Sequence, residues 1–154
     1  MEYVLQAVLF WCSGVATVLT SSIGIFGNLL SILVLTQKSM ASVFNHLLLS
    51  LCLSDLTFLL SSLVMSPIAM GYHELYPAEL YHGSECVCQV ALAASIFLTT
   101  SLSIERHQAV CVPHSYQARV VSTGHRTLLA SYVLPTVGLA TLLNIPRLVE
   151  FMQI

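Results

Sequence analysis

The sequence predicts an all-α membrane protein with four membrane-spanning helices and its N-terminus outside. The prediction rests on the composition, on the spacing of the charges and on the sign of the charges between the apolar stretches. Of the 154 residues, 56% are hydrophobic and 8% are charged, and the mean hydropathy is +0.86. An average soluble domain carries about a quarter of its residues as charges. So few charges argue against a soluble enzyme, a nucleic-acid-binding protein and a disordered chain.

The charges divide the chain into four apolar stretches. No Asp, Glu, Lys or Arg lies between Glu2 and Lys38, between Glu85 and Glu105, or between Arg126 and Arg147, and Asp55 alone interrupts the stretch from Lys38 to Glu74. Crossing the hydrocarbon core takes about 20 helical residues, and each crossing segment must satisfy its own backbone polar groups. We therefore predict helical spans at residues 4–37, 41–71, 86–110 and 125–145. The first is too long for a cleaved signal peptide and has no charged leader.

The connecting segments differ in charge and so predict the orientation. The first holds Lys38, and the third holds Arg106, Arg119 and Arg126, whereas residues 72–85 hold three Glu and no basic residue. Cytoplasmic loops carry an excess of Lys and Arg. The first and third connections are therefore predicted to be cytoplasmic, and both ends of the chain to be outside. Arg147 is then a basic residue on the outer side. We predict a multi-pass protein in the lipid bilayer that binds no nucleic acid.

Asp55 stands out because it is a charged residue deep inside a predicted span. An ionised side chain at that depth costs about 2.5–3.5 kcal/mol even on the lenient insertion scales. Such a residue usually faces the bundle interior and has a partner, and Asn28 lies at a comparable depth in the first span. Asp55 is therefore either an ion or proton site or a protonated residue that packs through a hydrogen bond.

The cysteines on the outer side and the Glu-Arg-His triplet are the remaining candidates. Cys86 and Cys88 lie on the oxidising side and are too close in sequence to bond to each other, so one can have a partner outside this chain. We predict no metal site, because cysteines on that face more often form disulfides. No phosphate-binding loop or nucleophile elbow is present, so no enzyme is predicted. Glu105-Arg106-His107 ends the third stretch, and Pro113 suits the first turn of a short helix that follows.

The order of these features resembles the rhodopsin-like (class A) G-protein-coupled receptors. The resemblance rests on Gly27-Asn28, on residues 45–56 with their inward Asp55, on Ser95, and on residues 101–113, where Glu105-Arg106-His107 stands in place of the family's Asp-Arg-Tyr. Residues 117–126 and 144–150, the latter reading Asn-Ile-Pro-Arg-Leu-Val-Glu, are similar to invertebrate FMRFamide-type neuropeptide receptors.

The resemblance implies a seven-helix bundle of which this chain supplies the first four helices. It implies an extracellular peptide ligand, a heterotrimeric G protein as partner and, for a full-length receptor, the plasma membrane. Asp55, Asn28 and Ser95 would form an internal polar site that holds a sodium ion. Glu105 would hold Arg106 at rest and release it toward the G protein, with His107 completing the triplet. Cys86 or Cys88 would form the disulfide with the second outer loop.

The chain also departs from the family pattern. It ends at Ile154, just past the fourth span, it lacks a Trp in that span, and its third span looks short before Arg106. We therefore expect the front portion of a receptor that does not signal alone. The alternatives are a complete four-span scaffold, channel or transporter subunit, in which Asp55 would serve permeation or coupling, and a truncated receptor that regulates a full-length relative.

Overall fold

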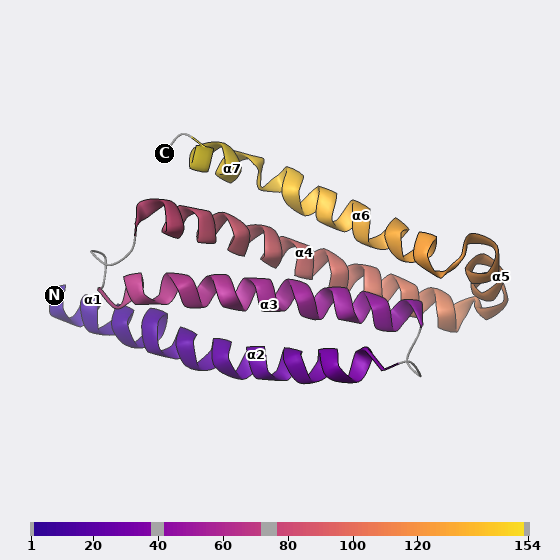
Figure 1. Ribbon diagram of the computed structural model, residues 1–154, viewed down its shortest axis with the longest axis horizontal. Coiled ribbons are helices and arrows are strands. Elements are labelled where there is room, and N and C mark those ends of the chain that lie inside the picture. Colours follow the sequence, from indigo (N-terminus) through magenta and orange to yellow (C-terminus); the bar gives the residue numbers. More distant parts are fainter. Residues whose placement is uncertain (1, 38–41, 72–76, 153–154) are drawn as a thin grey trace.

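Four long helical rods lie side by side in the computed structural model, which describes residues 2–37, 42–71 and 77–152 (Figure 1). The first rod is continuous and consists of α1 (Glu2–Val8), the π-helical η1 (Leu9–Val15) and α2 (Ala16–Leu35). It is followed by α3 (Val43–Ala69), α4 (Ala78–Cys111), α5 (Pro113–Thr123), α6 (His125–Leu143) and α7 (Ile145–Met152). The central pair is α3 and α4; α2 packs mainly against α3, and α6 mainly against α4.

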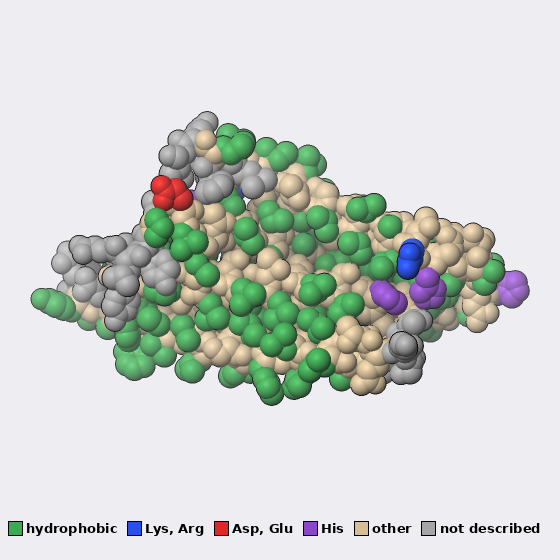
Figure 2. All heavy atoms as spheres, viewed as in Figure 1, with side chains coloured by type: hydrophobic (Ala, Val, Ile, Leu, Met, Phe, Trp, Pro, Cys, Tyr) green, Lys and Arg blue, Asp and Glu red, His purple; other side chains and the backbone are tan. Residues whose placement is uncertain are grey.

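The surface of these rods suits lipid rather than water. Within the described residues, four helices are long and apolar enough to cross a membrane: Tyr3–Leu35, Val43–Ile68, Glu79–Cys111 and His125–Leu143. Large apolar side chains such as Phe26 and Leu134 are exposed on their outer faces. Figure 2 shows hydrophobic side chains over the middle of the visible face, with basic and His side chains toward one end. The all-α, four-span prediction is confirmed.

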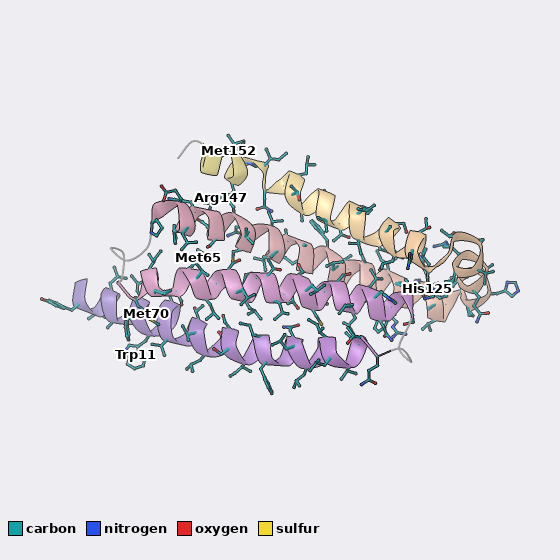
Figure 3. All side chains as sticks on the ribbon, in the orientation of Figure 1. Trp11, Met65, Met70, His125, Arg147 and Met152 are labelled. Atoms are coloured by element: carbon teal, nitrogen blue, oxygen red, sulfur yellow. The ribbon has the colours of Figure 1, made fainter. Side chains whose placement is uncertain are left out.

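The charges distinguish the two ends of the bundle. One end is formed by the start of α3, the end of α4, α5 and the start of α6, and we call it the inner end because the basic connections lie there. Both chain termini lie at the opposite, outer end (Figure 1). Figure 3 places His125 at the inner end and Arg147 at the outer end.

The third rod is longer than the sequence predicts. The expected span was 86–110, but α4 begins at Ala78 and ends at Cys111. The difference arises because a charge marks where the hydrocarbon core ends, not where the helix ends. Glu79 and Glu85 continue the helix into the polar interface, where Glu79 is exposed and Glu85 pairs with Arg147. The helix itself is therefore longer than the predicted span, while Cys86 and Cys88 remain 20 and 18 residues before Arg106.

Local sequence explains the helix ends that shape the inner end. Ser42 caps α3 by accepting the Asn45 backbone N–H at 3.2 Å. Pro113 opens α5 at its first turn, as predicted. α5 ends at Thr123, and the next residue, Gly124, has a φ of +79° that turns the chain directly into α6. That left-handed conformation favours glycine, which has no Cβ to clash.

A small apolar cluster fixes how the helices meet at the inner end. Val43 and Leu47 of α3 and Leu128 of α6 are buried together, with Leu102 of α4 and Val120 of α5 packed against them. The cluster therefore ties four helices to one another beside the end of α4. This packing holds the Glu105 region in place.

Candidate functional site

A carboxylate contact joins α3 and α4 near the middle of both helices. Asp55 is half-buried in α3, and the Ser95 hydroxyl of α4 donates a hydrogen bond to its Oδ1. The structure thus brings Asp55, which was selected for its charge inside a span, together with Ser95, which the resemblance implied. The hydroxyl offsets part of the cost of placing a carboxyl group in the apolar interior.

Asn28 does not join this contact. Its side-chain Nδ2 donates to the Gly24 carbonyl, one turn earlier in α2, at 2.9 Å. In the part of the chain that the structure describes, the expected donation to Asp55 is not formed. Equal depth in two helices does not fix the direction in which each side chain points, because each residue turns the helix by about 100°. Bonding back to the preceding turn satisfies the amide within its own helix.

A buried carboxyl group lies at the inner end of α4. Glu105 is 2% exposed, and its Oε1 accepts a hydrogen bond from the Tyr116 hydroxyl of α5 at 2.5 Å. Its Oε2 is buried and has no hydrogen-bond partner within the described residues. Burial, followed by the hydrogen bond to Glu105 and the charge of its carboxylate, raises the pKa of Tyr116 to about 12. Tyr116 therefore remains a hydrogen-bond donor to Glu105 across the physiological pH range.

A second contact lies one turn further along α4. The Gln108 Oε1 accepts from Arg119 Nη1 of α5 at 2.7 Å and from the Tyr132 hydroxyl of α6 at 3.3 Å. Residues three apart on a helix lie on the same face, so Glu105 and Gln108 of α4 meet Tyr116 and Arg119 of α5. We call Glu105, Gln108, Tyr116, Arg119 and Tyr132 the inner clasp.

Arg106 faces a different helix from Glu105. Its guanidinium carbon lies 3.2 Å from the centroid of the Phe44 ring at the start of α3, and the side chain is exposed. The expected Glu105–Arg106 pair is not formed in the described structure. Successive residues of a helix do not face each other, so Glu105 turns toward α5 while Arg106 turns toward α3. His107 is exposed beside them.

The two outer cysteines lie inside the bundle. The buried Cys86 thiol donates to the Arg147 carbonyl at 3.4 Å, and Cys88 Sγ lies 3.7 Å from Ser62 Oγ. Both are free thiols. Since α4 begins at Ala78, they lie about 12–15 Å along the helix from its outer end. The disulfide that the resemblance implies between one of them and a second outer loop stays a prediction, because that loop is not among the described residues.

An ion pair that the sequence did not predict lies at the outer end. Arg147 Nη1 of α7 lies 3.1 Å from Glu85 Oε1 of α4. The pair accounts for a basic residue on the outer side, where positive charge is otherwise disfavoured. Together with the Cys86 thiol, it docks α7 against α4 (Figure 3).

Comparison with known proteins agrees with a bundle of membrane-spanning helices. The sequence profile described as "7 transmembrane receptor (rhodopsin family)" matches residues 27–149. The FMRFamide receptor of Drosophila melanogaster is 27% identical over 154 residues, which cover 94% of this chain and 27% of that receptor. The type-1 angiotensin II receptor of Meriones unguiculatus is 36% identical over 135 residues, covering 83% of this chain and 35% of that receptor.

A third relative extends the same pattern. The type-1 angiotensin II receptor B of Xenopus laevis is 34% identical over 110 residues, which cover 63% of this chain and 27% of that receptor. The chain thus spans about a third or less of the length of these relatives. No solved structure matches the chain.

Proposed function

Because this chain belongs to the rhodopsin family of seven-transmembrane receptors, we propose that it is part of a receptor that transmits the binding of an extracellular peptide to a heterotrimeric G protein. The observation that carries the proposal is the arrangement at the inner end. Arg106 is exposed beside a buried Glu105 that α5 already holds. A cation is thereby presented at the membrane edge, and among the described residues no acidic side chain of its own helix pairs with it.

The inner end can act as a switch because the contact that holds Arg106 there contributes little free energy. An exposed cation–π contact stabilises by about 0.5–1 kcal/mol, so Arg106 can leave the Phe44 ring for an acceptor on the G protein at little cost. Glu105 does not have to release it, because Glu105 bonds to Tyr116 instead. In this proposal the resting element is the inner clasp, and ligand binding biases the position of α4 relative to α5 and α3.

The Asp55–Ser95 contact is the proposed internal ion site. A carboxylate and a hydroxyl from two helices are oxygen donors, which hard cations prefer, and they already lie together. Asp55 and Ser95 would therefore hold a sodium ion, whereas Asn28 points along its own helix. A bound sodium ion would neutralise the carboxylate of Asp55 inside the bundle. The ion would then fix the position of α3 relative to α4 at Asp55 and Ser95.

The ligand we propose is an FMRFamide-like peptide. The support is the similarity to the Drosophila FMRFamide receptor along 94% of this chain. The residues that belong to the proposed signalling end lie inside the matched region 27–149.

Nucleotide exchange tests this function. The protein is produced in insect cells from its own full transcript, and membranes are treated with FMRFamide or with angiotensin II as the comparison peptide. We expect FMRFamide to stimulate the binding of a non-hydrolysable GTP analogue to the G protein, and angiotensin II to have no effect. Equal exchange with and without FMRFamide, in membranes that hold the protein, would contradict the proposal.

A further inference from the structure

Two histidine rings from different helices lie against each other at the inner end. His46 of α3 and His125 of α6 have ring centroids 6.3 Å apart, with an angle of 79° between the ring planes. His46 is half-buried and His125 is exposed, so water reaches the pair. Figure 3 labels His125 at this end of the bundle. Neither ring has a role in the proposed coupling to the G protein.

The packing of α3 on α6 keeps the two rings together. Val43 of α3 and Leu128 of α6 are buried in the same apolar cluster. His46 lies three residues after Val43, and His125 lies three residues before Leu128. Each histidine therefore shares a helical face with a buried residue of that cluster. The rings lie at the rim of a packed contact, so bringing them together requires no rearrangement of the helices.

A backbone carbonyl fixes the tautomer of His46. The Nδ1 atom of its ring lies 2.7 Å from the Ser42 carbonyl oxygen. A carbonyl can only accept a hydrogen bond, so Nδ1 carries the proton and, in the neutral ring, Nε2 keeps its lone pair. Histidines that bind metals almost always donate their other ring N–H to a carbonyl, a carboxylate or water, which orients the ring. His46 already has this supporting hydrogen bond of a metal ligand.

The separation of the rings suits a metal ion between them. A zinc–nitrogen bond is about 2.0–2.1 Å long, which places the centroid of the ring about 3.2 Å from the metal. Two such centroids are about 5 Å apart at a tetrahedral angle and about 6.4 Å apart when the rings lie opposite each other, by the same bond length. The observed 6.3 Å lies within this range. The exposed His125 can rotate toward the tetrahedral arrangement.

Water would complete the coordination of such an ion. The described residues contain no group of three or more His, Cys, Asp or Glu side chains that could hold a metal, so the pair supplies two ligands. Imidazole nitrogen suits Zn²⁺, whereas Mg²⁺ and Ca²⁺ prefer oxygen. Figure 2 shows a basic side chain near histidines at this end, and its charge lowers the affinity for a cation. The site therefore binds zinc more weakly than sites with three or four protein ligands.

We propose that His46 and His125 form a zinc-binding site that ties the start of α3 to the start of α6. The site lies at the inner end, away from the outer cysteines at which no metal was expected. It goes beyond the proposed function, because neither histidine belongs to the Asp55–Ser95 contact or to the inner clasp. A bound ion would add a second link between α3 and α6 beside the apolar cluster.

The exposed His107 and Cys111 are the competing pair at the same end. They lie four residues apart on α4 and so share a face of that helix. Both side chains are exposed and lose rotamer freedom when they bind an ion, whereas His46 is already oriented by Ser42. The geometry therefore favours His46 and His125, and a variant of Cys111 distinguishes the two pairs.

Zinc binding is measured by calorimetric titration of the full 154-residue chain in detergent micelles, with zinc chloride as the probe. We expect saturable binding that a chelator reverses, and His46→Gln and His125→Gln should each weaken it by about tenfold or more. His114→Gln is the matched control, because His114 is exposed on α5 at the same end; it should keep the wild-type affinity, as should Cys111→Ser. No saturable binding, undiminished affinity in both His46→Gln and His125→Gln, or loss of affinity in Cys111→Ser would overturn the assignment.

The link between the helices is measured by amide hydrogen exchange at the starts of α3 and α6, residues 43–47 and 125–128. Zinc at about ten times the measured Kd should slow the exchange that requires these helices to separate by about tenfold. His125→Gln replaces an exposed side chain, so its exchange without zinc should match wild type. At the same zinc concentration its exchange should slow by about twofold or less.

Unchanged exchange in zinc-loaded wild type, or equal slowing in His125→Gln, would refute the link. Neither measurement needs a peptide ligand or a G protein. Failure of the zinc site is therefore distinct from failure of the receptor proposal, which nucleotide exchange tests.

Discussion

Replacing Tyr116 by Phe tests the buried link between α4 and α5. The substitution keeps the ring and removes the hydroxyl that donates to Glu105 Oε1 at 2.5 Å. Glu105 is 2% exposed and its Oε2 already lacks a partner within the described structure. In the variant, both carboxyl oxygens would be buried without a donor unless α5 lifts and lets water reach them.

The size of the effect follows from that loss. An unsatisfied buried polar group costs about 1–3 kcal/mol, and each 1.36 kcal/mol is about a factor of ten in an equilibrium constant. The undocked form of α5 should therefore become about 5- to 150-fold more populated, by the same conversion. Amide hydrogen exchange of residues 113–123 reports this population when reclosing is faster than exchange.

The Tyr132→Phe variant is the matched control. Its hydroxyl makes a longer bond, 3.3 Å, to Gln108 Oε1, which also accepts from Arg119. Gln108 keeps a donor in that variant, so exchange of α5 should rise less than about fivefold. If Tyr116→Phe leaves exchange of α5 unchanged, or Tyr132→Phe raises it as much, the reasoning about the buried carboxyl is wrong.

Three further predictions follow from the same contacts. Absorbance titration should assign a pKa of about 12 to Tyr116, taken from the difference between wild type and Tyr116→Phe. Because a raised pKa stabilises the docked form of α5 at pH values below the ordinary tyrosine pKa of about 10, α5 should stay docked at neutral pH and be released between about pH 10 and 12. A measured pKa near 10 would contradict the burial of Tyr116. Ser95→Ala should lower the free energy of unfolding in detergent by about 0.6–1.7 kcal/mol, as for other interhelical hydrogen bonds in membranes. An unchanged free energy of unfolding would show that the hydrogen bond from Ser95 to Asp55 does not stabilise the fold. Glu85→Gln should raise amide exchange of α7 by no more than about fivefold, because partly exposed ion pairs contribute at most about 1 kcal/mol; a larger rise would mean that this pair dominates the docking of α7.

Simple patterns in the sequence predict most of the fold. Long apolar stretches between sparse charges require spanning helices in lipid, and the sign of the connecting charges orients them. Pro113 predicts the start of α5 because its ring suits a first helical turn. The start of α4 at Ala78 was missed because Glu79 and Glu85 interrupt the apolar pattern without interrupting the helix.

The site was predicted in part, and the reason is geometric. Asp55 was selected for its charge and Ser95 through the resemblance, and the packing of α3 on α4 brings them together. The direction of Asn28 could not be predicted, because depth along a helix says nothing about the face on which a residue lies. The same limit applies to Glu105 and Arg106, which are adjacent in sequence and point to different helices.

The inner clasp was missed for a different reason. Tyr116 and Arg119 lie in a segment that the sequence describes only as a basic connection with a short helix. Their contacts depend on the turn at Val112, where the chain leaves α4 and enters α5. The spacing of three residues in both Glu105–Gln108 and Tyr116–Arg119 was an available signal, since it places each pair on one helical face.

Agonist-stimulated nucleotide exchange in Arg106 variants tests the central claim most directly. Wild type, Arg106→Ala and Arg126→Ala are compared at equal surface expression. Both arginines are exposed at the inner end, but only Arg106 lies on α4 beside the inner clasp. The account predicts that Arg106→Ala loses peptide-stimulated exchange while still binding the peptide, and that Arg126→Ala retains both. Full exchange in Arg106→Ala, or equal loss in the two variants, would contradict a specific role for Arg106 in coupling to the G protein.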